Sequence, residues 1–134
     1  MATIEELEGV SWGDPKKGET PMIRRCLALR RTRLDDFTLD DLRLMLGQQI
    51  GVPILLPRAV KILIRDPLAE AGYPGDLLYA VVRLPDTAWA SLLIQRRRLA
   101  DAAAPLLDSV FADVRPLVRD FVNAHAHPAH RRSP

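Results

Sequence analysis

The segment Thr38-Leu-Asp-Asp-Leu-Arg-Leu-Met-Leu-Gly-Gln-Gln-Ile50 has the pattern of an amphipathic helix with a marked beginning. Thr38 is a favourable N-cap, Asp41 stands at the capping-box position, and Asp40 suits the positive end of a helix. The apolar side chains recur at helical steps on one face: Leu39, Leu42, Met45, Leu46 and Ile50. The segment therefore predicts a helix that packs on a core, ended by the break at Gly51-Val-Pro53.

The next segment, Ile54–Ile64, is apolar on most sides, which predicts the helix at the centre of the core. Pro57 within it is tolerable only in the first helical turn, because proline has no backbone N–H to donate. The dipeptide Asp66-Pro67 is expected to end this helix.

Two further helices are predicted on the N-terminal side. Thr3 and Glu6 have capping-box spacing and open a short helix that Gly9 would stop. After a loop, a second helix is expected from Thr20 to about Arg31. The single cysteine, Cys26, lies on its apolar face and is expected to be buried, and one cysteine excludes an intramolecular disulfide.

Towards the C-terminus, the turn-rich segment 71–75 precedes Asp76, which is expected to cap a helix over Leu77–Leu84. A short β-strand remains an alternative there, because periodicity does not separate a short buried strand from a short buried helix. From Pro85 onwards the apolar spacing is again helical. Pro105 and Pro116 divide this long stretch into two or three helices, or kink a single one.

These elements predict an all-α fold: one compact domain of about six helices over residues 1–124, with a long C-terminal helical stretch. The length of 134 residues suits one domain, and an apolar content of 48% is too high for a disordered chain. Residues 125–134, which hold His125, His127 and His130, are expected to form a flexible tail.

The charge pattern gives little support to nucleic-acid binding. Residues 1–90 carry a net charge of −1 and residues 91–134 a net charge of +3. Arg96, Arg97 and Arg98 form the densest basic run, but successive helical residues point about 100° apart and cannot all face one groove. A small helical DNA-binding regulator using these arginines stays as the alternative function, and steep salt dependence of DNA binding would mark it.

No group of residues suggests catalysis. The sequence has no glycine-rich phosphate loop, no nucleophile elbow and no Cys/His pair, so we expect a protein that is not an enzyme. The three histidines fall in the predicted tail, where ligand geometry would not be fixed, so no metal or other cofactor is expected. Without a signal peptide or an apolar run long enough to span a bilayer, the expected location is cytoplasmic.

Several segments, in the same order and spacing, resemble the immunity proteins of contact-dependent growth inhibition (CDI). They are Leu7-Glu-Gly-Val-Ser-Trp-Gly-Asp-Pro15, Phe37–Pro53, Leu56-Pro-Arg-Ala59 and Asp66–Leu78. The resemblance covers about residues 4–90 and implies a cytosolic protein that neutralises the C-terminal toxin domain of a cognate polymorphic toxin, frequently a nuclease. It implies no catalytic position. Many nuclease inhibitors are strongly acidic, whereas this chain has a net charge of +2.

Within the matching motifs, the glycines are expected at turns or close-packed positions: Gly9, Gly13, Gly47, Gly51 and Gly75. Trp12 is expected to fasten the first loop to the core. The candidate partner-binding residues are Asp35, Asp36, Asp40, Arg43, Gln48 and Tyr73. For Arg43, Gln48 and Gln49 structural support is favoured over partner contact, and Tyr73 is an interface aromatic. The C-terminal stretch could also pair between copies, so a homodimer stays open.

Overall fold

The computed structural model describes residues 2–130, and in that range every regular element is helical. The α-helices are α1 (Ile4–Glu8), α2 (Pro21–Arg30), α3 (Leu39–Gly47), α4 (Val52–Arg65), α5 (Asp76–Val82), α6 (Leu93–Ala103) and α7 (Arg115–His125). Short 3-10 helices are η1 (Leu34–Asp36), η2 (Asp86–Trp89), η3 (Ala104–Ser109) and η4 (Pro128–His130). The predicted all-α class is confirmed.

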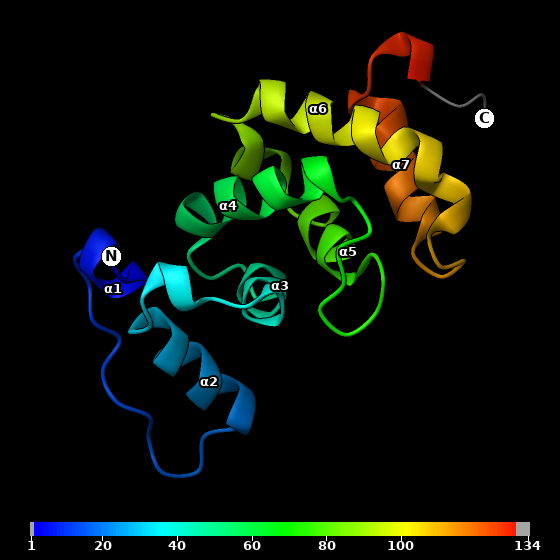
Figure 1. The fold of residues 1–134 in the computed structure, drawn as a ribbon. Coiled ribbons are helices and arrows are strands. Elements are labelled where there is room, and N and C mark those ends of the chain that lie inside the picture. The colour runs from blue at the N-terminus through cyan, green and yellow to red at the C-terminus, as the bar shows by residue number, and fades with distance from the viewer. Residues whose placement is uncertain (1, 131–134) are drawn as a thin grey trace.

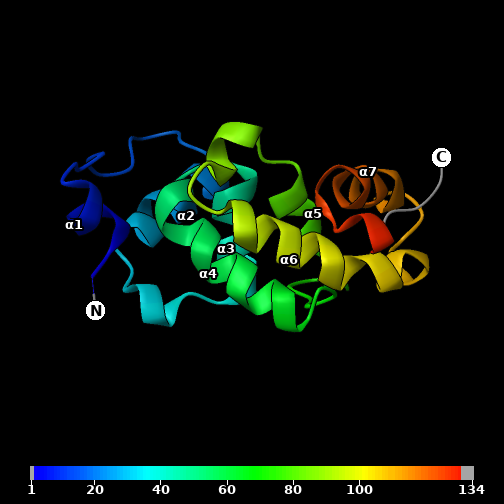
Figure 2. The same ribbon diagram turned by 90° about the horizontal axis from the view of Figure 1, so that it is seen from above.

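Helix α4 lies at the centre of the fold, as its apolar sequence predicts. It packs against α6 on one side and against α3 and α5 on the other (Figure 1). Its side chains Leu55, Leu56, Ala59 and Leu63 are completely buried. Seen from above, α1 lies at one end of the molecule and α7 at the other (Figure 2). The α3–α5 pair, which borders the candidate site, is therefore backed by the central helix α4.

The predicted start of α4 is wrong by two residues. The helix begins at Val52, after Gly51 in the left-handed conformation, so Pro57 lies in its second turn and not in its first. Pro57 and Pro53 are both exposed. The Pro53 carbonyl, which loses its helical donor to Pro57, can therefore bond to water, and this is why the helix tolerates the proline.

Gly51 and Gly47 make a matched pair for a stability measurement. Gly51 is buried with φ +66°, and a Cβ there would lie 3.0 Å from Ile4 Cδ1. We expect Gly51→Ala to lower the free energy of unfolding by about 2 kcal/mol, through backbone strain and crowding. Gly47 ends α3 with nothing within 4 Å of its Cβ position, so Gly47→Ala should be neutral or stabilise by about 0.5–1 kcal/mol. Urea unfolding followed by circular dichroism compares them, and equal losses would contradict this account.

The segment Leu77–Leu84 is helical, so the β-strand alternative is wrong, although α5 already ends at Val82. The long C-terminal stretch is divided as its prolines predict. Pro105 lies in the first turn of η3 and Pro116 in the first turn of α7. η3 continues directly from the end of α6, and both pack against α7 after the chain reverses in the loop that follows Ser109 (Figure 1).

The predicted boundary at residue 125 does not coincide with the end of the packed structure. Helix α7 runs through His125, Ala126 is buried, and the His127 backbone N–H donates to Asp101 Oδ1 of α6 at 2.7 Å. Residues 131–134 of the predicted tail lie outside the described residues.

The N-terminal helices are held by a buried arginine. Arg30 of α2 is 1% exposed; its guanidinium forms an ion pair with Glu8 and donates to the Val10 carbonyl at 2.7 Å. The prediction that Trp12 fastens the first loop to the core is wrong, because its side chain is 51% exposed and its ring lies 4.0 Å from the Arg30 guanidinium carbon. The loop is thus fixed to α2 through this stacking and not through apolar burial.

Cys26 of α2 is buried, as predicted from its position on the apolar face. Burial raises the pKa of its thiol, and the neighbouring Arg25 only partly opposes this. The side chain therefore contributes packing as a neutral thiol.

Candidate functional site

A groove of about 410 Å³ runs between α3 and α5, closed at one side by the loop before α5. Four of the predicted partner-binding residues line it: Asp40, Arg43, Gln48 and Tyr73. The other residues that line the groove are Leu44, Gly47, Gly72, Asp76, Tyr79, Ala80 and Arg83. We call this feature the α3–α5 groove. Residues separated by more than forty positions in the sequence meet there because α3 and α5 pack side by side.

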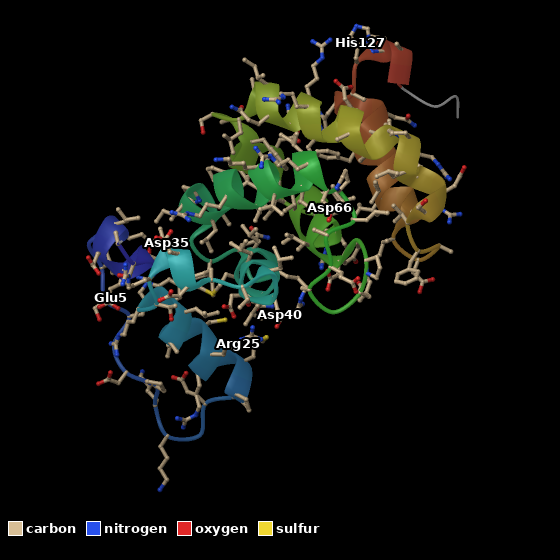
Figure 3. All side chains as sticks on the ribbon, viewed as in Figure 1. Glu5, Arg25, Asp35, Asp40, Asp66 and His127 are labelled. Atoms are coloured by element: carbon tan, nitrogen blue, oxygen red, sulfur yellow. The ribbon has the colours of Figure 1, made fainter. Side chains whose placement is uncertain are left out.

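Asp35 and Asp36, the other two predicted contacts, are not part of this groove. They lie exposed on η1, and Figure 3 places Asp35 towards α1, apart from Asp40. Asp35 lies 3.8 Å from the Arg58 guanidinium of α4. Asp35 and Asp36 therefore belong to a different part of the surface from Asp40.

The acidic start of α3 is matched by arginines. One Arg25 nitrogen lies 2.8 Å from both Asp40 Oδ2 and Asp41 Oδ1, and Arg43 Nη2 lies 2.7 Å from Asp40 Oδ1 (Figure 3 shows Arg25 beside Asp40). The hydrogen bonds that Asp40 accepts from Arg43 and then from Arg25 lower the pKa of Asp40, and those that Arg25 donates to Asp41 and then to Asp40 raise the pKa of Arg25. The carboxylates at the start of α3 are therefore not free, because Arg25 of α2 and Arg43 of α3 itself supply counter-charges.

Asp76 shapes the loop that carries Tyr73. Its side chain is 3% exposed and accepts backbone N–H bonds from Ala71 at 2.9 Å, Gly72 at 2.8 Å and Tyr73 at 3.3 Å. The expectation that it caps its own helix is wrong in position: Gly75 is the N-cap residue and Asp76 the first residue of α5. Because one carboxylate binds three successive N–H groups, the loop is fixed tightly against the groove.

Aromatic side chains border the groove. Tyr73 is 40% exposed and Phe111 is 51% exposed, and their ring centroids lie 5.4 Å apart. Within the groove, the Arg83 guanidinium lies over the Tyr79 ring at 5.1 Å. Exposed aromatic and arginine side chains in one place are typical of protein-binding surfaces.

The sequence predictions differ in their outcome for the polar residues of α3. Arg43 has the structural contact that was favoured for it, since it binds Asp40 and lies 3.9 Å from Asp76 Oδ2. Gln48 and Gln49 are both exposed, and within residues 2–130 no hydrogen bond of their side chains is present. The expected support of the helix end by these amides is therefore wrong; backbone N–H groups after α3 bond its last carbonyls instead.

The predicted glycine positions divide into two kinds. Gly9, Gly13, Gly51 and Gly75 have positive φ angles, as their expected place at turns requires. Gly47 has neither a positive φ nor a close neighbour, and it lines the groove floor. Its lack of a side chain leaves space beside Gln48.

The basic run of α6 does not form one face. The Arg96 side chain is 16% exposed and lies 3.6 Å from Asp86, whereas Arg97 and Arg98 are exposed.

His125 packs edge-on against Phe121, with the two ring centroids 5.0 Å apart. Across the part of the chain that the structure describes, no group of three His, Cys, Asp or Glu side chains could hold a metal ion, and no helix is long and apolar enough to cross a membrane.

Sequence reasoning missed Arg25, Tyr79, Arg83 and Phe111. The pattern around Tyr79 and Arg83 gives only a short helix, and the approach of Phe111 to Tyr73 depends on how α7 folds back. Tyr79 followed four residues later by Arg83 was the one available signal, since that spacing puts both on one helix face.

Comparisons with known proteins agree with the motifs. A family model described as CDI immunity proteins matches residues 6–99. This range includes every residue that lines the α3–α5 groove. No curated protein matched the chain, and neither did any solved structure. Because the family model covers well over half of the sequence, this chain belongs to the CDI immunity protein family.

Proposed function

We propose that the protein binds the C-terminal toxin domain of a cognate polymorphic toxin and neutralises it as a one-to-one inhibitor in the cytoplasm of the producing cell. Membership of the CDI immunity family carries this proposal. A nuclease is the toxin class that the family resemblance favours. Inhibition then rests on binding, and no residue of this chain needs a catalytic role.

We further propose the α3–α5 groove and its aromatic border as the toxin-binding face. The groove lies within the family-matched range, and it gathers four candidate contact residues from α3, from the residue that follows α3 and from the loop before α5. Tyrosine and arginine side chains are the residues that most often dominate binding energy at protein interfaces. A concave surface with a rigid floor also needs little ordering on binding, because α3 and α5 pack directly on α4.

The alternative of a DNA-binding regulator receives no comparable support. Arg96 is half-buried beside Asp86, so only Arg97 and Arg98 of the basic run are exposed. Two neighbouring arginines supply little of the phosphate contact that non-specific DNA binding requires.

Tyr73→Ala tests the proposed face. Tyr73 is 40% exposed and packs on Phe111, so its removal is expected to weaken toxin binding at least tenfold without unfolding the protein. Isothermal titration calorimetry with the cognate toxin domain measures the change. Ile94→Ala, at a 73% exposed position on α6 outside the groove, is the matched control.

Asp36→Ala separates the two surfaces that the sequence singled out. If the groove is the contact, this η1 variant should bind as the wild type does and should protect cells that express the toxin domain. A larger loss with Asp36→Ala than with Tyr73→Ala would place the contact on η1. Absence of both complex formation and growth rescue with the wild type would contradict the proposed function itself.

A further inference from the structure

The hydrogen-bond acceptors of the α3–α5 groove are already occupied. Asp40 accepts from Arg43 through Oδ1 and from Arg25 through Oδ2, each at 2.8 Å. Asp76 accepts three backbone N–H groups and is 3% exposed. The two carboxylates of the groove therefore have little capacity left to bind donors from a partner.

The side-chain donors of the groove other than Arg43 are, by contrast, unused among residues 2–130. Arg83 is exposed, stacks on Tyr79, and has no carboxylate within 4.0 Å in the part of the chain from 2 to 130. Within the same range, the Gln48 amide and the Tyr73 hydroxyl make no hydrogen bond. The groove thus offers one arginine without a nearby carboxylate, together with neutral donors that line the same groove.

We propose that the groove receives a single aspartate or glutamate side chain of the toxin domain, bound by Arg83, with Gln48 and Tyr73 lining the same groove. This inference rests on the proposed function. An arginine guanidinium matches a carboxylate with two parallel hydrogen bonds, and its stacking on Tyr79 holds the plane in place.

The charge of the groove favours one carboxylate over a nucleic acid. Asp40, Asp41 and Asp76 each lie within 4.0 Å of Arg25 or Arg43, so Arg83 is the arginine of the groove that has no carboxylate at this distance among residues 2–130. A phosphodiester chain would bring several negative charges towards the two fixed carboxylates. One carboxylate on a protein surface can pair with Arg83 while bringing only one negative charge towards them, so it meets less of this repulsion.

Charge reversal on the intact protein tests the inference. Arg83→Glu should weaken binding of the cognate toxin domain by about 30-fold or more in titration calorimetry, with an unchanged circular dichroism spectrum. Arg97→Glu makes the same change at an exposed arginine outside the groove and should bind as the wild type does. Arg83→Lys should lie between these results, because it keeps the charge and loses the paired hydrogen bonds.

The toxin domain then supplies the second half of the test. Its Asp and Glu residues are changed one at a time to Arg, and one of these variants should regain binding with Arg83→Glu while losing it with the wild type. Binding of Arg83→Glu within threefold of the wild type would overturn the inference and leave the proposed function standing. Loss of binding that no reversal restores, or low-salt binding of a 20-base-pair DNA duplex that Arg83→Glu abolishes, would overturn the carboxylate as occupant. A wild-type protein that does not bind the toxin domain would overturn both proposals.

Discussion

Asp76→Ala is expected to lower the free energy of unfolding by about 2–3 kcal/mol and to weaken toxin binding, although the Asp76 side chain is buried beneath the groove. The carboxylate holds the backbone N–H groups of residues 71–73, which position Tyr73. Without it these donors lose a charged acceptor, and the loop no longer has one fixed conformation. Urea unfolding and titration calorimetry on the same variant measure the two effects.

The stability that Asp76 supplies should depend on pH. Burial alone would raise its pKa, but N–H bonds from Ala71, Gly72, Tyr73 and Leu77 outweigh burial and lower the pKa below its ordinary value. The contribution is therefore complete above the unfolded-state pKa of about 3.9 and is lost as the pH falls through the lower folded-state value. Unfolding curves between pH 7 and pH 2 should show a smaller acid loss for Asp76→Asn than for the wild type. Identical pH profiles would contradict this role.

Glu8→Ala is expected to cost about 3 kcal/mol, because it leaves the buried Arg30 guanidinium without its carboxylate. Arg30 would keep only the Val10 carbonyl and the Trp12 ring as partners, and its Nε already has no hydrogen-bond partner within residues 2–130. Guanidinium chloride unfolding measures the loss of stability.

The double variant Glu8→Ala/Arg30→Met provides the control for this pair. Replacing both charges removes the unpaired cation and fills its space with an apolar side chain, so the double variant should be more stable than Glu8→Ala alone. If the losses of stability in Glu8→Ala and in Arg30→Met simply add up to the loss in the double variant, the Glu8–Arg30 ion pair does not hold the N-terminal helices as described.

Local signals predicted the helices well where capping and periodicity agree. Thr20 and Thr38 cap α2 and α3 through their side chains, and Pro105 and Pro116 begin new helical elements. The start of α4 was missed because Gly51 begins the helix from a left-handed conformation, which no side-chain signal announces. Trp12 was misplaced for a related reason: its partner is a buried cation on α2, whereas apolar patterns indicate only apolar partners.

The candidate site was partly predictable. Asp40, Arg43, Gln48 and Tyr73 were selected on separate grounds, and the packing of α3 on α5 brings them together. The pairing of Asp40 and Asp41 with Arg25 was not predictable, because it depends on the angle at which α2 approaches α3. That Arg83 has no carboxylate within 4.0 Å among the described residues is a property of the folded chain and could not be read from the sequence. Charge along a sequence does not reveal which charges remain unpaired in space.

Hydrogen–deuterium exchange on the protein, free and bound to the toxin domain, tests the central claim most directly, because it maps the contact without altering either partner. If the α3–α5 groove is the toxin-binding face, amide exchange should slow most in the loop 71–76 and in the segments 43–49 and 79–84 that border it. Protection confined to η1 or to residues 93–98 of α6, with unchanged exchange in the loop 71–76, would contradict the account.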